Sequence, residues 1–276
     1  MKKLFFSFLS LLGLILVTAN SVFATASVGT LANATISADT TGGVYTALTG
    51  PVLTEGANRD ITSSSGTIIL SIPTTFQFNT SATVSAVVTR VNGSGTAVAL
   101  SSAIAAVTTS NITITVTGRD SNDGSTRSSI TWSGIKVRPT AGTPLATNNI
   151  TISATSTEPI NGITDGTTNF GTLTETAGAA TKLGYTTAPA ATNTAGATMT
   201  SVVVQVQDQF GNSVSSNNVA ITVALNTGAF ASGTTNVNTG AGGSATFNNL
   251  VINTVGSYTL VGFWVACVNL RVQQTD

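Results

Sequence analysis

Short runs in which β-branched residues alternate with small polar ones recur along this chain and limit the folds that it can adopt. From Ile112 to Val116, Ile or Val occupies every second position and Thr lies between. In the run 67–72, Ile68, Leu70 and Ile72 alternate in the same way. Successive side chains of a strand point to opposite faces, so each run predicts a strand with one buried and one hydrated face. This pattern is typical of antiparallel β-sandwiches.

Further runs of strand length follow, and after residue 26 none shows a convincing helical period. Turn residues separate the runs, and Asp123-Gly124 suits a tight hairpin. Pro139 and Pro144 are expected to close the strand that contains Trp132. We therefore predict an all-β fold. The expected strands are 31–38, 66–72, 82–91, 112–117, 128–138, 149–154, 200–207, 219–225, 244–252, 257–263 and 265–272.

The strand pattern thins between residues 172 and 197 into Thr, Ala, Gly and Pro. We place a domain boundary there, which gives an N-terminal β-sandwich domain at 27–178 and an immunoglobulin-like β-sandwich domain at 179–276. About 250 residues follow residue 26, enough for two ordinary domains with real cores. The second set of strands fits a seven-strand sandwich in length and spacing.

Charge is scarce in this chain, which excludes one class of partner. Charged residues make up 7% of the sequence, far below the usual quarter. Without Lys2 and Lys3, eight basic residues remain against ten acidic ones. No basic field is therefore expected to attract nucleic acid or anionic lipid. The abundance of Val, Ile and Thr argues against disorder, because these residues suit pleated strands.

The first 26 residues have the layout of a secretory signal peptide. Lys2 and Lys3 form a positive start, an apolar run covers residues 4–17, and small residues lie around Ala24 and Ala26. Cleavage after either alanine fits the pattern. The apolar run is too short to span a bilayer, and no later stretch is long enough. We expect a signal peptide at 1–26 and a mature chain that is secreted or held at the cell surface, without a membrane span.

The single cysteine, Cys267, cannot form an internal disulfide. We interpret it as a half-buried strand residue, with an intermolecular bridge as the alternative. No cysteine near the cleavage site offers a position for a lipid anchor. The sequence therefore does not indicate how the protein is retained outside the cell.

Four sequence blocks in the second half form an ordered series, at 204–214, 219–223, 243–250 and 256–260. In their order and spacing, residues 182–263 resemble a repeat of large secreted bacterial surface proteins that have immunoglobulin-like domains of the invasin and intimin (Big) type. The resemblance implies a surface protein, often with a row of such repeats. The apolar run 263–268 departs from it, which indicates either a last strand buried between sheets or a fragment of a longer array.

The blocks also point to residues with structural roles. Asp208 can accept backbone N–H bonds between two strands, and Gly211 and Asn212 tolerate positive φ. Tyr258, two residues after Gly256, resembles a tyrosine corner, whose hydroxyl ties a crossover to the sandwich. The residues 36–43 and 135–142 resemble, more weakly, N-terminal β-rich regions of similar surface proteins, and no chemistry follows from them.

Calcium binding is the functional alternative for three carboxylates. Asp208 has few carboxylates near it in sequence, although calcium takes six or more oxygens. Asp120 and Asp123 lie in a segment that distantly resembles a calcium loop, but its glycine comes one residue early and the distal Glu is missing. We therefore favour turn roles for all three, and we expect no cofactor.

Catalytic chemistry is largely excluded by what the sequence lacks. There is no histidine and only one cysteine, which removes His-dependent triads and the usual zinc and thiolate metal sites. A carboxylate pair for glycoside hydrolysis is the surviving option. The acids of the first half lie mostly among Gly, Ser and Thr, where solvated turn residues are the expected state. We predict that the protein is not an enzyme.

Two aromatic residues are candidates for stacking on a sugar ring. Trp132 alternates with Ile130 in its predicted strand, which places both on one face and favours the core. Tyr45 is the second candidate. Aromatic residues are 6% of the chain, too few for a broad carbohydrate-binding surface.

Three functions remain open at the sequence level. The first is a structural or adhesive surface protein whose sandwiches serve as spacer and display modules. The second is a subunit of an extracellular filament or sheet assembled by strand pairing, favoured by the low charge and the apolar last strand. The third is a carbohydrate-binding module. The expected partners are other surface proteins, glycans or copies of the chain itself.

Overall fold

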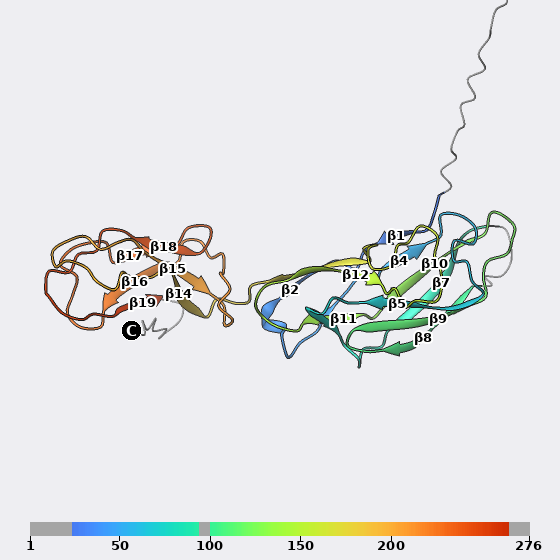
Figure 1. Cartoon of the computed structure of the whole chain (residues 1–276), viewed down its shortest axis with the longest axis horizontal. Helices are drawn as coiled ribbons and strands as arrows, with labels where there is room; N and C mark the ends of the chain where they lie inside the picture. The colour runs from blue at the N-terminus through green and yellow to red at the C-terminus, as the bar shows by residue number, and fades with distance from the viewer. Residues whose placement is uncertain (1–23, 94–99, 265–276) are drawn as a thin grey trace, which may run out of the picture.

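The chain folds into two β units, each built around its own hydrophobic core. The computed structural model describes residues 24–93 and 100–264. One core contains residues from Ala26 to Leu173 and the other residues from Leu183 to Leu260. We call these the N-terminal and the C-terminal unit, and Figure 1 shows them as two lobes joined end to end. The predicted boundary at residues 178 and 179 lies between the two cores and stays a prediction.

The prediction of an all-β fold with antiparallel sheets is confirmed. The described residues contain β-strands and one short 3₁₀ helix, η1 (Ala38–Thr40). In the N-terminal unit the strands form three sheets, with the orders β1-β4-β10-β7, β3-β11-β6 and β2-β13-β12-β5-β9-β8. Their bounds are β1 Ser27–Thr30, β2 Ala34–Ser37, β3 Thr46–Ala47, β4 Val52–Thr54, β5 Ser65–Ser71, β6 Phe76–Phe78, β7 Ser85–Asn92, β8 Ser101–Val107, β9 Asn111–Thr117, β10 Arg127–Ser133, β11 Lys136–Pro139, β12 Thr147–Ile152 and β13 Gly171–Thr176.

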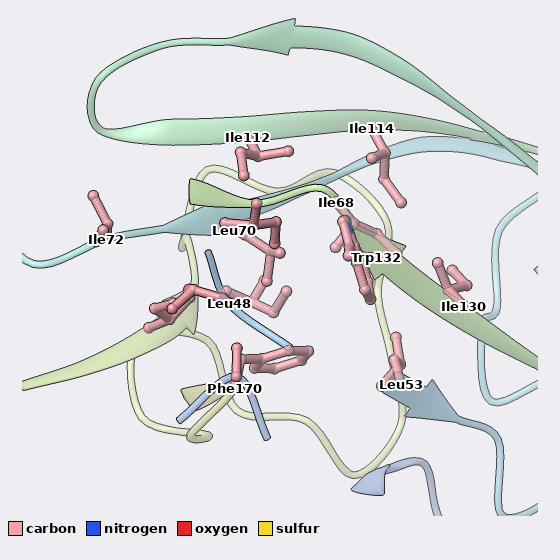
Figure 2. Close-up of a cluster of buried hydrophobic side chains, with 14 of the residues drawn as sticks. Leu48, Leu53, Ile68, Leu70, Ile72, Ile112, Ile114, Ile130, Trp132 and Phe170 are labelled. Carbon is pink, nitrogen blue, oxygen red and sulfur yellow. The ribbon is translucent and has the colours of Figure 1, made fainter. Parts of the chain in front are cut away.

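The alternating runs form the core as their period predicts. In β9, Ile112 and Ile114 are buried, and they lie opposite Leu70 and Ile68 of β5 in the antiparallel register. Figure 2 shows these side chains in one buried cluster with Trp132, which belongs to β10 of another sheet. Burial of large apolar side chains contributes roughly 1.5–3 kcal/mol each, so this interior is the main source of stability in the unit.

Two strands replace the single strand that we expected over 128–138. β10 ends at Ser133 and β11 begins at Lys136, because Gly134 adopts a φ of +72°, a region that interrupts an extended strand. The two strands then pair with different partners, β10 with β4 and β7, and β11 with β3 and β6. Pro139 is the last residue of β11 and lies opposite Phe76.

Further expectations about strands and turns were wrong in detail. The segment 172–197, which looked thin in strand pattern, contains most of β13 and all of β14. β13 pairs with β2 in parallel, so the six-stranded sheet is mixed. The turn at Asp123-Gly124 is not a hairpin, since β9 and β10 on its two sides belong to different sheets.

The C-terminal unit has two three-stranded sheets, with the orders β14-β15-β18 and β17-β16-β19. Both contribute to one core, through Val204 of β15 and Ile221 of β16 among others, in agreement with an immunoglobulin-like sandwich. Cys267 and the predicted strand 265–272 lie outside the described residues. The bounds are β14 Lys182–Thr187, β15 Val202–Gln207, β16 Ala220–Leu225, β17 Asn236–Asn238, β18 Ser244–Phe247 and β19 Leu260–Trp264.

A search of the described residues for a helix long and apolar enough to cross a membrane finds none.

Candidate functional site

The loop after β15 is organised by one fully buried carboxylate. Asp208 Oδ1 accepts hydrogen bonds from the backbone N–H groups of Phe210 and Asn212, both at 2.9 Å. Its Oδ2 accepts from the Asn212 side chain and from the backbone N–H of Gly178, both at 2.8 Å. Burial by itself would raise the pKa of Asp208, but these four donors outweigh it and hold the pKa below its usual value. Gly211 has a φ of +92°, which lets the loop turn back.

The same loop connects the two units. Asn212 Nδ2 donates to the backbone oxygen of Gly142 at 2.7 Å. Gly142 is buried against the ring of Phe210, and a Cβ at this glycine would overlap the ring. Gln209 Nε2 donates to Oδ1 of Asp39 at 3.0 Å. The loop therefore contacts two separate segments of the N-terminal unit, near residues 39 and 142, and the connecting segment at residue 178.

The segment that connects the two units is hydrogen-bonded to both of them. The backbone N–H of Gly178 bonds to Asp208 of the C-terminal unit, and that of Ala179 bonds to Asp39 Oδ2 of the N-terminal unit at 2.6 Å. Glu175, at the end of β13, is buried, and burial together with the negative charge of Asp208 raises its pKa. We refer to Asp39, Gly142, Gly178, Asp208, Phe210 and Asn212 with Gln209 as the junction. Its residues join the two units by hydrogen bonds and by the packing of Phe210 on Gly142.

The calcium candidates of the N-terminal unit have their oxygens occupied by donors. Asp120 is buried and accepts the Ser128 hydroxyl at 3.0 and 2.8 Å. Asp123 accepts the Thr126 hydroxyl and the backbone N–H groups of Ser125 and Thr126, which lower its pKa. A calcium ion would have to displace these donors, as it would at Asp208. Within the described ranges, no three His, Cys, Asp or Glu side chains gather as a metal site.

The two aromatic candidates have different surroundings. Trp132 is 1% exposed and packs edge-on against Phe170, with ring centroids 6.3 Å apart. Figure 2 shows both side chains in the same buried cluster. A ring at this depth cannot stack on an external ligand. Tyr45 is half-buried, and the guanidinium of Arg138 lies 4.6 Å from its ring centroid. One face of Tyr45 is thus covered by a cation–π contact.

A groove of about 690 Å³ lies beside Tyr258 in the C-terminal unit. The Tyr258 hydroxyl donates to the backbone oxygen of Thr254 at 3.1 Å, four residues upstream. Gly256 leaves room for the ring, since a Cβ there would come within 3.2 Å of the hydroxyl. Its lining, taken over the residues that the structure describes, combines aliphatic and aromatic side chains with amide and hydroxyl groups and includes no charged residue. Such a surface has no carboxylate, imidazole or amine for proton transfer.

Sequence reasoning missed a set of buried acids. We expected the acids of the first half to be solvated in turns, but Glu55, Asp60 and Asp120 are 2–3% exposed. Glu158 and Glu175 are also buried. A signal for Glu55 was available: it lies two residues after Leu53 of β4, so a strand period places both on the inward face. Backbone N–H groups take the place of bulk water around these carboxyls, as at Glu55 and Glu158.

Comparisons with known proteins give little outside support. No protein-family model matches the chain, and no curated protein matches it. Among solved structures, the chain is similar to the D0-D1 domain of intimin, with 14% sequence identity and a TM-score of 0.26. The match covers 90% of this chain and 93% of the intimin fragment. The fold assignment above therefore rests on the strands and cores of this chain.

Proposed function

We propose that this chain is an exported, non-enzymatic protein of the cell surface, in which the two β units act as a rigid spacer and present their outer end to a partner. Its partner is another surface protein, a glycan or a second copy of the chain. The signal-peptide layout supports export. The missing histidines and the uncharged groove support a role without catalysis.

The observation that carries the spacer role is the junction. Two units joined by a flexible linker change their relative orientation by default. Here the linker residues Gly178 and Ala179 are hydrogen-bonded to both units, and Phe210 packs into the space left by Gly142. Of the donors to the buried Asp208 carboxylate, only the Gly178 N–H comes from outside its own loop, and opening at this point would take that bond away. A spacer gains reach only if its parts keep one orientation, and the contacts of the junction support this role.

The rigidity can be measured by ¹⁵N relaxation and small-angle X-ray scattering on the purified mature protein. We expect both units to share one rotational correlation time and the scattering to fit one extended shape. Asp208→Ala should let the units tumble separately while both stay folded. Asp165→Ala removes a carboxylate that is exposed on the N-terminal unit and should change neither reading. Independent tumbling of the unaltered protein would refute the rigid spacer, and robust turnover of a polysaccharide or ester would refute the non-enzymatic role.

Assembly by strand pairing is the second candidate function. Among the described strands, which end at Trp264, β19 lies at the edge of its sheet, and its Phe263 is 44% exposed. An exposed apolar edge strand can pair with a second copy. In the same scattering experiment, an apparent mass that rises with protein concentration would favour assembly, and a constant monomer mass at high concentration would argue against it.

A further inference from the structure

Two cleavage positions fit the signal-peptide pattern, after Ala24 and after Ala26. The second fits the small-residue rule more literally, since it has alanine at both the last and the third-last position, whereas the first has Val22 at the third-last position. We propose that the signal peptide is removed after Ala24, so that the mature protein begins at Thr25. This inference rests on the proposed export.

Ala26 is part of the folded unit. It is 3% exposed and belongs to the hydrophobic core of the N-terminal unit. Its backbone N–H donates to the oxygen of Asn161 at 3.0 Å, one residue after the isolated bridge between Ile61 and Ile160. Cleavage after Ala26 would remove a core residue and leave the Asn161 oxygen without this donor. The residue is thus needed in the mature chain.

Two glycines leave the space that Thr25 occupies. A Cβ at Gly56 would overlap the carbonyl group of Thr25 and the carbonyl carbon of Ala24, and a Cβ at Gly162 would overlap the Thr25 side chain and the Ala26 oxygen. Gly162 also has a φ of +90°, a conformation that favours glycine. Two loops from different parts of the chain therefore have no side chain where Thr25 lies. Removing Thr25 would leave both spaces open.

Cleavage after Ala24 keeps the contacts of Thr25 and Ala26 and gives up only that of the Ala24 carbonyl carbon with Gly56. Ala24 and Thr25 are exposed as residues, so the new ammonium group at Thr25 lies in water and costs little. The reaction is hydrolysis of the Ala24–Thr25 peptide bond by a membrane-bound signal peptidase. Water supplies a hydroxyl group to the carboxyl of Ala24 and a proton to the amine of Thr25. No other reactant is needed.

The first test is the N-terminus of the exported protein. The full-length chain is secreted from a bacterial host, and the product is analysed by intact mass and N-terminal sequencing. We expect Thr25 as the first residue. Ala24→Leu alters only the removed segment, but it takes a small residue from both candidate sites, so it should leave uncleaved precursor. A wild-type product that begins at Ser27, or an uncleaved chain, would overturn the proposal.

The second test does not depend on export or on a spacer role. Chains that begin at Ala24, Thr25 and Ser27 are released from a cleavable tag and compared by thermal unfolding. The first two should share one Tm for the N-terminal unit, because Ala24 is exposed. The chain from Ser27 should melt lower by about 4 °C, the shift that follows from losing a hydrogen bond and a buried methyl group in a domain of this size. Equal Tm values for all three would contradict the proposal even if the rigid spacer is verified.

Discussion

At the scale of single residues, a pair of buried carboxyl groups is the least expected feature of the molecule. Glu55 and Asp120 lie on either side of Ser128, whose N–H donates to Glu55 Oε2 at 2.8 Å and whose hydroxyl donates to Asp120. Burial, and to a smaller extent the neighbouring Asp120, raises the pKa of Glu55 to about 7. The nearby arginines donate to backbone oxygens, Arg59 to that of Asp120 and Arg127 to that of Gly56.

This pair makes stability depend on pH in a defined direction. The folded chain holds the Glu55 proton more tightly than the unfolded chain, so the free energy of unfolding falls as pH rises from about 4.5 to 7. At 1.36 kcal/mol per pH unit the loss is about 3 kcal/mol. Asp120→Asn removes the neighbouring charge and should recover about 1 kcal/mol of it at pH 8. Urea unfolding at pH 5 and pH 8 measures this change in the free energy of unfolding, and the exposed Asp165→Asn is the control. If the free energy fell by the same amount in wild type and in Asp120→Asn, Asp120 would have no part in the pH dependence.

At the scale of elements, one glycine separates two consecutive strands that belong to different sheets. Gly134 lies between β10 and β11, and a Cβ there would overlap the backbone oxygen of Thr83. With its φ of +72°, the residue ends one strand and lets the next join another sheet. Gly124, in the loop after β9, has a similar φ of +70° but nothing within 4 Å of a Cβ. Gly124 therefore has backbone strain alone as a barrier to a side chain, whereas Gly134 has both strain and steric overlap.

Alanine substitutions at the two glycines should therefore differ in effect. Gly124→Ala should cost about 1 kcal/mol, the strain of a left-handed conformation for a residue with a Cβ. Gly134→Ala adds the clash with Thr83 and should cost about 3 kcal/mol or more. Chemical denaturation of the N-terminal unit measures both. If the two variants lost the same stability, the close approach of Thr83 would not constrain this position.

At the scale of the whole molecule, the relative position of the two units depends on close packing as well as on hydrogen bonds. Gly142 is buried against Phe210 at the junction, and its backbone oxygen accepts from Asn212. Each unit has its own core cluster, so a change at the junction alters the connection more than it alters either interior. The linker 177–181 is the segment that such an opening would expose.

Gly142→Val should open the junction without unfolding the units. The added side chain displaces the Phe210 ring, and a change of about 1.4 kcal/mol in the opening equilibrium raises the open population about tenfold. Limited proteolysis at 177–181 should accelerate by a similar factor, with unchanged Tm values for both units. Gly43→Val adds the same side chain in open space and should leave the rate unchanged. A Gly142→Val rate equal to wild type would mean that Phe210 packing does not hold the joint.

The sequence by itself determined the all-β class and the inward faces of strands such as β5 and β9. Alternation is a local property, because every second side chain of a strand points to the same face. The buried residues Ile68, Leu70, Ile112 and Ile114 could therefore be assigned to the core before their partners were known. The role of Asp208 as an acceptor of backbone N–H groups was also readable, because an Asp before Gly and Asn prefers such turns. That prediction did not include its bond to Gly178 across the junction.

Tertiary structure alone decided the remaining features. The parallel pairing of β2 with β13, the burial of Glu55 beside Asp120, and the contact of Phe210 with Gly142 all join residues that are far apart in the chain. Alternation shows that a residue faces inward, but it does not say what lies opposite. The same reason applies to the two cleavage positions. The small-residue pattern favours the position after Ala26, whereas the folded N-terminal unit, with Ala26 in its core and Gly56 and Gly162 around Thr25, favours the position after Ala24.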